Sequence, residues 1–191
     1  SVEFEPRETG SVCVPAGATV HQQILLDVPK PALWEAEHPN LYRLTASLRL
    51  DGQCVETVSR AIGFREIEIR GNELLVNGTP VKLRGVDRHE AHPLRGRSLT
   101  PQLSRRDAEL FKAANCNFVR TSHYPPAEEF IEACDELGLY VEEEAPFCFF
   151  NPADRPELTE EEVTRYIVYA NLKMVERDLT HPSVILWSIG N

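Results

Sequence analysis

The sequence predicts two regions of different fold class, an antiparallel β region over residues 1–62 and an α/β region over residues 63–191. Apolar residues of the first region recur at every second position, which is the period of a strand with one buried face. In the second region, short apolar runs alternate with segments of helical period. Strands that alternate with helices in this way indicate a parallel sheet, so we expect a multidomain chain of β plus α/β class.

The clearest strand of the first region covers residues 41–50. Its apolar residues alternate with polar ones, and Asp51-Gly52 then supplies a hairpin turn. A second alternating segment runs from Val20 to Val28. Because about 60 residues fall short of the roughly 100 of an immunoglobulin-like domain, we expect a partial immunoglobulin-like β-sandwich over residues 1–62. From Arg65 to Leu83, we expect short strands with hairpin turns at Gly71-Asn72 and Asn77-Gly78.

The α/β region contains four predicted strands and three predicted helices. The strands are expected at Val81–Val86, Asn117–Thr121, Leu139–Glu143 and Val184–Ser188. The helices are expected at Ser104–Asn115, Ala127–Leu137 and Thr159–Leu179, with Gly138 as a C-terminal cap and capping boxes at Ser104/Asp107 and Thr159/Glu162. Four parallel strands are half of an eight-stranded barrel, so the sequence predicts the first half of a (β/α)8 TIM barrel over residues 63–191. Unpaired edges of such a sheet favour a homo-oligomer through those edges.

Composition narrows the range of partners. The net charge of −10 with no basic cluster disfavours nucleic acid and anionic membranes. No apolar run approaches the roughly 18 residues that span a bilayer. The first residues lack a signal-peptide pattern, which favours the cytoplasm, although periplasmic or secreted locations stay open because an earlier segment could precede Ser1. Five scattered cysteines without metal spacing indicate reduced thiols, and we expect no metal and no cofactor.

Polar residues follow each of the four strands of the α/β region. They lie at residues 87–90, 120–124, 142–144 and 188–191. The carboxyl ends of barrel strands form the face on which active sites are built. The sequence therefore predicts that these four groups of polar residues converge on one site.

Four segments together resemble glycoside hydrolase family 2, the group of β-galactosidases, β-glucuronidases and β-mannosidases. They are Gly63-Phe64-Arg65, residues 84–90, residues 121–125, and Trp187 to Asn191. The resemblance covers Leu33 to Asn191 and implies a retaining exo-β-glycosidase that hydrolyses terminal β-linked sugars. It also implies that the general acid/base glutamate follows Asn191 and that the nucleophile lies further along. We therefore expect no catalytic residue within residues 1–191, and no activity of this segment alone.

The resemblance also assigns substrate-binding roles. It implies that His123 and Arg120 contact the sugar or orient a catalytic carboxylate, and that Asn191 binds the sugar 2-hydroxyl. His89 belongs to a His-Glu pair in which one side chain bonds back to the rim while its neighbour shapes the sugar pocket. Ala91 stands where many relatives carry a sugar-binding His or Asp, so His92 is the candidate substitute.

Three alternatives stay open. Two of Glu142, Glu143 and Glu144 could form a catalytic pair, but only the first and third share a strand face, and we expect instead that one glutamate pairs with Arg120 or Arg84. Residues 88–93 favour a β-galactoside substrate, while residues 121–129 indicate a β-glucuronide, which we rank second. A non-catalytic carbohydrate-binding or scaffold protein on the same fold is the alternative function. The stretch Pro146 to Phe150 replaces the Glu-Thr-His of enteric β-galactosidases and argues against a magnesium site of that type.

Overall fold

The computed structural model describes residue 8 and residues 10–149 and 158–191, and it divides the chain into two units, 1–31 and 32–191. The described part of the first unit contains no helix and no strand. The predicted strand from Val20 to Val28 was therefore wrong: its apolar side chains, such as Leu25 and Ile24, are exposed. A strand needs a neighbour to pair with its backbone, and alternation alone does not supply one. Residues 1–7 and 9 of the predicted sandwich, and Phe150, lie outside the described residues.

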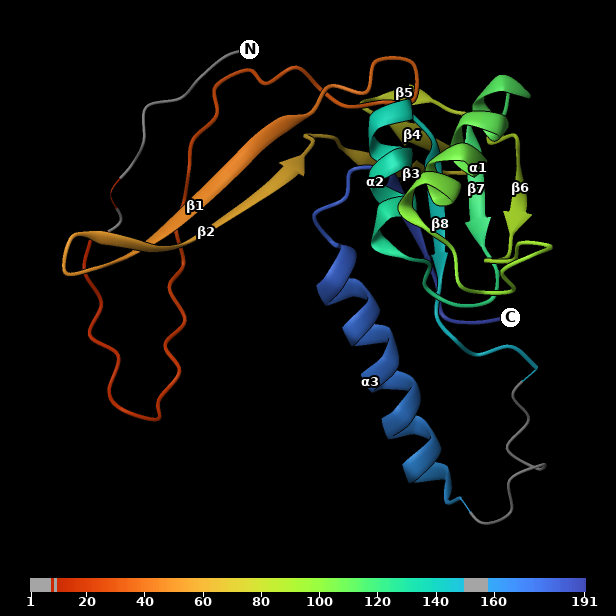
Figure 1. Ribbon diagram of the computed structural model, residues 1–191. Coiled ribbons are helices and arrows are strands. Elements are labelled where there is room, and N and C mark those ends of the chain that lie inside the picture. Colours follow the sequence, from red (N-terminus) through yellow and green to blue (C-terminus); the bar gives the residue numbers. More distant parts are fainter. Residues whose placement is uncertain (1–7, 9, 150–157) are drawn as a thin grey trace. The chain divides into compact units, whose positions relative to one another are not determined.

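The second unit begins with a two-stranded antiparallel hairpin, β1 (Tyr42–Leu50) and β2 (Gln53–Ile62) (Figure 1). Its turn is the predicted Asp51-Gly52, whose φ angles of 49° and 80° are positive. The strand was expected to be half-buried, but nearly all of its residues are exposed. The reason is that no other described strand pairs with this hairpin. The predicted boundary at residue 62 stays a prediction.

A three-stranded antiparallel sheet follows, with both predicted turns in place. It consists of β3 (Ile67–Arg70), β4 (Glu73–Val76) and β5 (Thr79–Pro80). Val76 of this sheet packs in a core cluster with Trp34, Tyr140 and Ile185. Trp34 meets Tyr140 edge to face at 5.8 Å, and its indole N–H donates to the carbonyl of Asp135 at 2.8 Å.

Four parallel strands form the sheet that positions the site. They are β6 (Gly85–Arg88), β7 (Phe118–Thr121), β8 (Tyr140–Glu144) and β9 (Val184–Ser188), hydrogen-bonded in that order. Figure 1 shows the arrowheads of β6 and β7 pointing toward the end of the sheet at which Asn191 lies. The predicted half-barrel is confirmed, although β6 begins later than expected because Val81 still pairs with Leu74 of the small sheet.

Three helices accompany these strands: α1 (Pro101–Ala113), α2 (Glu128–Leu137) and α3 (Glu160–Asp178). The capping box of α3 and the left-handed Gly138 after α2 are as predicted. The predicted Ser104 cap was wrong, because α1 begins at Pro101 and its N-cap is Thr100, whose hydroxyl accepts the amide of Leu103. Proline is favoured in the first turn because its missing N–H would be unpaired there. Among the described residues, no helix is long and apolar enough to cross a membrane.

Buried apolar side chains join α1 and α2 to β7, β8 and β9. The cluster comprises Ala108, Val119, Phe130, Ile131, Ala133, Cys134, Leu139, Val141 and Val184. β6 and β9 each have one hydrogen-bonded neighbour among the described strands, so the predicted pairing of copies through these edges stays a prediction. A second core cluster joins Tyr140 and Ile185 of the sheet to Trp34 and Val76, so the polar residues gather at the carboxyl ends of the strands.

Candidate functional site

Arg120, on β7, joins the polar ends of all four parallel strands. Its Nη2 donates to Oδ1 of Asn191, which follows β9, at 3.0 Å. Its Nη1 lies 3.5 Å from Oδ1 of Asp87 on β6, and the guanidinium forms an ion pair with Glu144 on β8. The parallel strands therefore gather their polar ends as predicted, around one guanidinium.

Glu144 is the buried anion of this cluster, with a fully buried side chain. Its Oε1 lies 2.7 Å from Nδ1 of His123, and Ser188 Oγ donates to Oε2 at 3.5 Å. Its backbone N–H donates to Oγ1 of Thr121 at 3.1 Å. The sequence predicted that one of three glutamates pairs with Arg120 or Arg84; strand alternation leaves Glu142 and Glu144, and the structure pairs both with Arg120.

His89 extends the cluster toward solvent. It is exposed, and its ring meets that of His123 edge to face with centroids 5.2 Å apart. The neighbouring Glu90 bonds back to the rim, because its Oε1 accepts from Arg88 and from the backbone of Ala127 at 3.0 Å. One member of the His-Glu pair thus ties the loops together while the other lies beside His123.

His92 lies apart from these residues. Its Nδ1 accepts the amide of Leu94 at 3.2 Å, and its backbone pairs with Gly96, so its hydrogen bonds in the described structure stay within its own turn. Among the described residues, no hydrogen bond or ring contact joins His92 to His123, and the role of His92 in sugar binding stays a prediction. The same loop instead brings Arg97 over the ring of Tyr124 at 4.0 Å, a cation that sequence reasoning missed.

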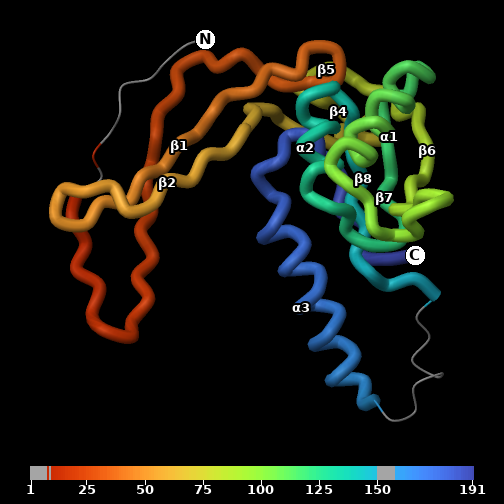
Figure 2. The backbone as a smooth tube through the Cα atoms, viewed as in Figure 1, coloured from red at the N-terminus to blue at the C-terminus, as the bar shows by residue number. Residues whose placement is uncertain are grey.

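The segment after β8 holds Asn191 in place. The backbone N–H of Asn191 donates to the backbone carbonyl of Phe147 at 2.7 Å, and the backbone N–H of Phe149 donates to the backbone carbonyl of Asn191 at 3.4 Å. Figure 2 shows the cyan chain after β8 beside the blue end of the chain. A Cβ on Gly190, whose φ is 145°, would lie 2.7 Å from that same carbonyl of Phe147. Glycine at this position therefore allows the two segments to meet.

Electrostatics argue against the alternative catalytic pair. Glu142 and Glu144 do share a face, but Glu144 is fully buried and engaged by Arg120 and His123, so a substrate cannot reach it. Burial raises the pKa of Glu142; Arg120 lowers it, while Glu144 and Asp87 raise it further. Among the described residues, no group of three or more His, Cys, Asp or Glu side chains is placed to hold a metal ion.

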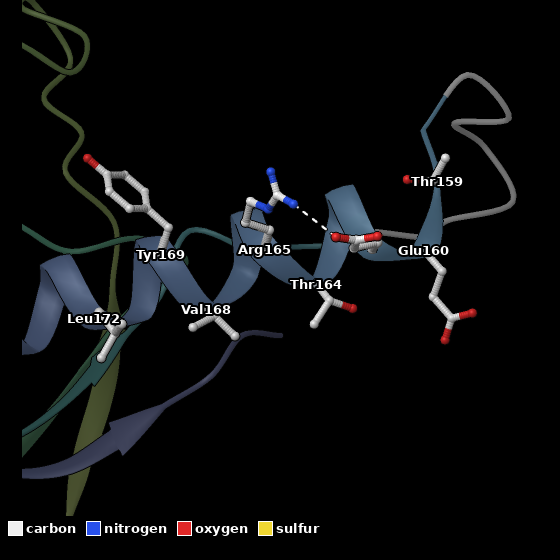
Figure 3. A pocket seen from close by; sticks show the side chains of 8 residues that line it. Thr159, Glu160, Thr164, Arg165, Val168, Tyr169 and Leu172 are labelled. Atoms are coloured by element: carbon white, nitrogen blue, oxygen red, sulfur yellow. Dashed lines mark hydrogen bonds and ion pairs between the residues drawn. The ribbon is translucent and has the colours of Figure 1, made fainter.

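A groove along α3 contains none of the predicted site residues. Figure 3 shows it as the exposed side of the helix, with Tyr169 and Leu172 at one end and Thr159 at the other. An exposed ion pair between Arg165 and Glu161, at 2.9 Å, crosses it. We therefore take the polar cluster around Arg120 as the candidate site.

Comparisons with known proteins agree with this architecture. The model of the family described as Glycosyl hydrolases family 2, TIM barrel domain, matches residues 67–191, and the model described as Glycosyl hydrolases family 2 matches residues 5–65. A β-glucuronidase from Ruminococcus gnavus in complex with D-glucaro-δ-lactam is 34% identical, with a TM-score of 0.75 over 84% of this chain and 27% of that chain.

Two further solved structures match in the same way. Bacteroides uniformis β-glucuronidase 3 is 33% identical, with a TM-score of 0.76 over 86% of this chain and 20% of that one. Parabacteroides merdae β-glucuronidase is 30% identical, with a TM-score of 0.77 over 86% of this chain and 20% of that one. The chain thus spans about a quarter of the length of such proteins or less. With its barrel segment matched over residues 67–191, the chain belongs to glycosyl hydrolase family 2.

Proposed function

We propose that the cluster around Arg120 is the sugar-binding part of the active site of a retaining exo-β-glycosidase. The convergence of Arg120, His123 and Asn191 at the carboxyl ends of parallel strands carries this proposal. A sugar needs several hydrogen-bonding groups aimed at one hollow, and this rim supplies amide, imidazole and guanidinium groups together.

Each residue has a proposed role. Asn191 binds the 2-hydroxyl, a contact that strengthens as the sugar ring gains oxocarbenium character. His123 and His89 bind other hydroxyls, and Arg120 orients Asn191. In a retaining mechanism, one carboxylic acid protonates the leaving oxygen while a carboxylate attacks the anomeric carbon. We place the acid directly after Asn191 and the nucleophile further along the complete protein.

We propose a terminal β-glucuronide as the substrate, ahead of the β-galactoside that the sequence favoured. The three β-glucuronidases named above support this order, as does a Ruminococcus gnavus β-glucuronidase solved in complex with D-glucuronic acid, which is 33% identical. Arg97, at the rim beside Tyr124, adds a positive charge that suits an anionic sugar.

The test uses the complete protein and measures release of 4-nitrophenol from its β-glucuronide, β-galactoside and β-mannoside. We expect turnover of the β-glucuronide, and turnover of the β-galactoside alone would restore the order of preference given by the sequence. Sugar binding without turnover of any β-glycoside would overturn the proposal in favour of a carbohydrate-binding protein.

Asn191→Ala provides a sharper test of the site. Loss of a hydrogen bond that strengthens in the transition state should lower kcat/KM by about 100-fold or more, mainly through kcat. The matched control is Asn72→Ala in the exposed turn between β3 and β4, which should leave kcat/KM unchanged. Equal effects of the two substitutions would contradict the role of Asn191.

A further inference from the structure

We propose that Glu144 is a positioning residue. It fixes the proton on Nδ1 of His123 and, through Arg120, the orientation of the side-chain amide of Asn191. The site then offers a sugar one acceptor, Nε2 of His123, and one donor, Nδ2 of Asn191. The inference rests on the proposed function, because it concerns groups that the proposal assigns to sugar binding. Its first test, however, does not measure turnover.

The proton on His123 follows from what each partner can donate. A carboxylate only accepts hydrogen bonds, and Oε1 of Glu144 lies 2.7 Å from Nδ1 of His123. Nδ1 must therefore be the donor. In the neutral ring this leaves Nε2 without a proton, so Nε2 accepts from a sugar hydroxyl.

The Asn191 amide is oriented by the same logic. A guanidinium only donates, so the atom of Asn191 that lies 3.0 Å from Nη2 of Arg120 is the oxygen. The Nδ2 group then points elsewhere, and its contact in the structure is a thiol, Cys148 Sγ, at 3.7 Å. A thiol is a weak acceptor, so the amide N–H groups are available to a ligand.

Glu144 connects these two effects because its carboxylate engages both His123 and Arg120. Ser188 Oγ also donates to this carboxylate, the backbone N–H of Glu144 donates to Thr121 Oγ1, and the side chain of Glu144 is fully buried. A purely structural role would make its replacement change stability alone. If Glu144 positions its neighbours, its replacement also changes which nitrogen of His123 carries the proton.

The first experiment records long-range ¹H–¹⁵N spectra of the histidine rings in the 191-residue chain. His123, assigned by its loss in His123→Gln, should show the neutral tautomer with the proton on Nδ1. A neutral ring with the proton on Nε2 would overturn the proposal, since an ionised carboxylate cannot donate to Nδ1. This measurement needs no variant that alters Glu144.

In Glu144→Gln, we expect His123 to adopt the opposite tautomer. Arg120 can only donate, so it draws the new amide oxygen toward itself, and the NH2 group then faces Nδ1 of His123. The proton of His123 should therefore move to Nε2. Glu143→Gln, one residue earlier on the opposite face of β8, is the matched control and should leave His123 unchanged. If Glu144→Gln folds and the proton of His123 stays on Nδ1, the proposal is also overturned.

Kinetics of the complete protein separate this inference from the proposed function. Glu144→Gln should lower kcat for β-glucuronide hydrolysis by about 100-fold, because the misdirected groups no longer match the sugar. If the unmodified protein hydrolyses no β-glycoside, the proposed function fails, while the tautomer of His123 still decides the positioning role. Normal kcat in Glu144→Gln would refute the positioning role while hydrolysis itself stands.

Discussion

The two faces of β8 put the same residue type to different uses. Glu142 and Glu144 face Arg120 and the candidate site, whereas Glu143 between them faces Arg177 and Asp178 of α3. Alternation along a strand is what separates them. One strand of five residues thus supplies both an anion of the site and an anchor for a helix.

The side of β8 that faces α3, here called the anchor side, contains two fully buried carboxyl groups. Glu143 and Asp178 are both fully buried in their side chains, and Arg177 donates to Oε1 of Glu143 at 3.2 Å and to the carbonyl of Pro126 at 3.0 Å. Burial, together with the hydrogen bond and charge of Asp178, raises the pKa of Glu143 to about 9. Glu143 is therefore protonated at neutral pH.

The difference shows how neighbours set the state of a carboxyl group. On the anchor side, two buried carboxyl groups compete for one guanidinium, and one of them keeps its proton. On the site side, Glu144 has donors from Arg120, His123 and Ser188. The site side thus gives one buried carboxyl group three donors, whereas the side that faces α3 gives two buried carboxyl groups one guanidinium.

Among the substitutions that test the two faces of β8, Arg177→Met should lower the free energy of unfolding the most. The substitution removes the cation from a buried pair of carboxyl groups, and breaking a buried ion pair costs several kcal/mol. Because Arg177 is 40% exposed, we expect a smaller loss, about 2 to 4 kcal/mol in the free energy of unfolding. Urea denaturation of the chain measures it.

Arg165→Met on the same helix is the matched control. Arg165 pairs with Glu161, and both side chains are largely exposed, so we expect a loss below about 0.5 kcal/mol. Equal losses in the two variants would show that the anchor contributes no more than an exposed ion pair.

The second prediction concerns pH. The folded-state pKa of Glu143 lies above its unfolded value, so its contribution to stability is complete below pH 4.5 and is lost as pH rises toward 9. The slope is at most about 1.4 kcal/mol per pH unit for one proton. Glu143→Gln, which imitates the protonated form, should flatten the pH dependence of urea midpoints between pH 5 and 9.

His181, near Asp178, also contributes to the pH dependence of stability between pH 5 and 9. His181 lies 2.6 Å from Asp135 and 4.0 Å from Asp178; burial lowers its pKa, but these two carboxylates outweigh burial and raise it above 6.5. Its contribution is also lost as pH rises above 6.5. His181→Gln should therefore remove only a part of the slope that begins above pH 6.5. An unchanged slope in Glu143→Gln would contradict the assignment to Glu143.

Much of the parallel sheet could be predicted from the sequence because its signals are local. Apolar runs such as 184–188, the left-handed Gly138 and the capping box at Thr159 each act within a few residues. The segment at Val20 to Val28 shows the limit, because its alternation was correct for a strand but its partner strand is not given by its own residues. The predicted start of α1 was wrong because Thr100 caps the helix and Pro101 is tolerated in its first turn, so the helix begins before Ser104.

The site was predictable at the level of strand ends but not of individual contacts. Arg120, His123 and Asn191 meet because parallel strands end together. The hydrogen bonds of His92 stay within its own turn and its role in sugar binding stays a prediction, while Arg97 could not be placed because a loop's path does not follow from strand ends. Alternation distinguished Glu144 from Glu143, but only the structure shows that Arg120 rather than Arg84 is the partner.

Glu142→Gln should have the smallest effect, and its sign is informative. Burial raises the pKa of Glu142, so its ionised form costs stability at pH 7, and the neutral amide removes that cost. We expect a gain below about 1 kcal/mol at pH 7 that disappears near pH 4, since Arg120 at 3.8 Å compensates part of the charge. A loss of stability at pH 7 would instead mean that Glu142 helps Glu144 to hold Arg120, and the site side of β8 would then depend on two carboxylates rather than one.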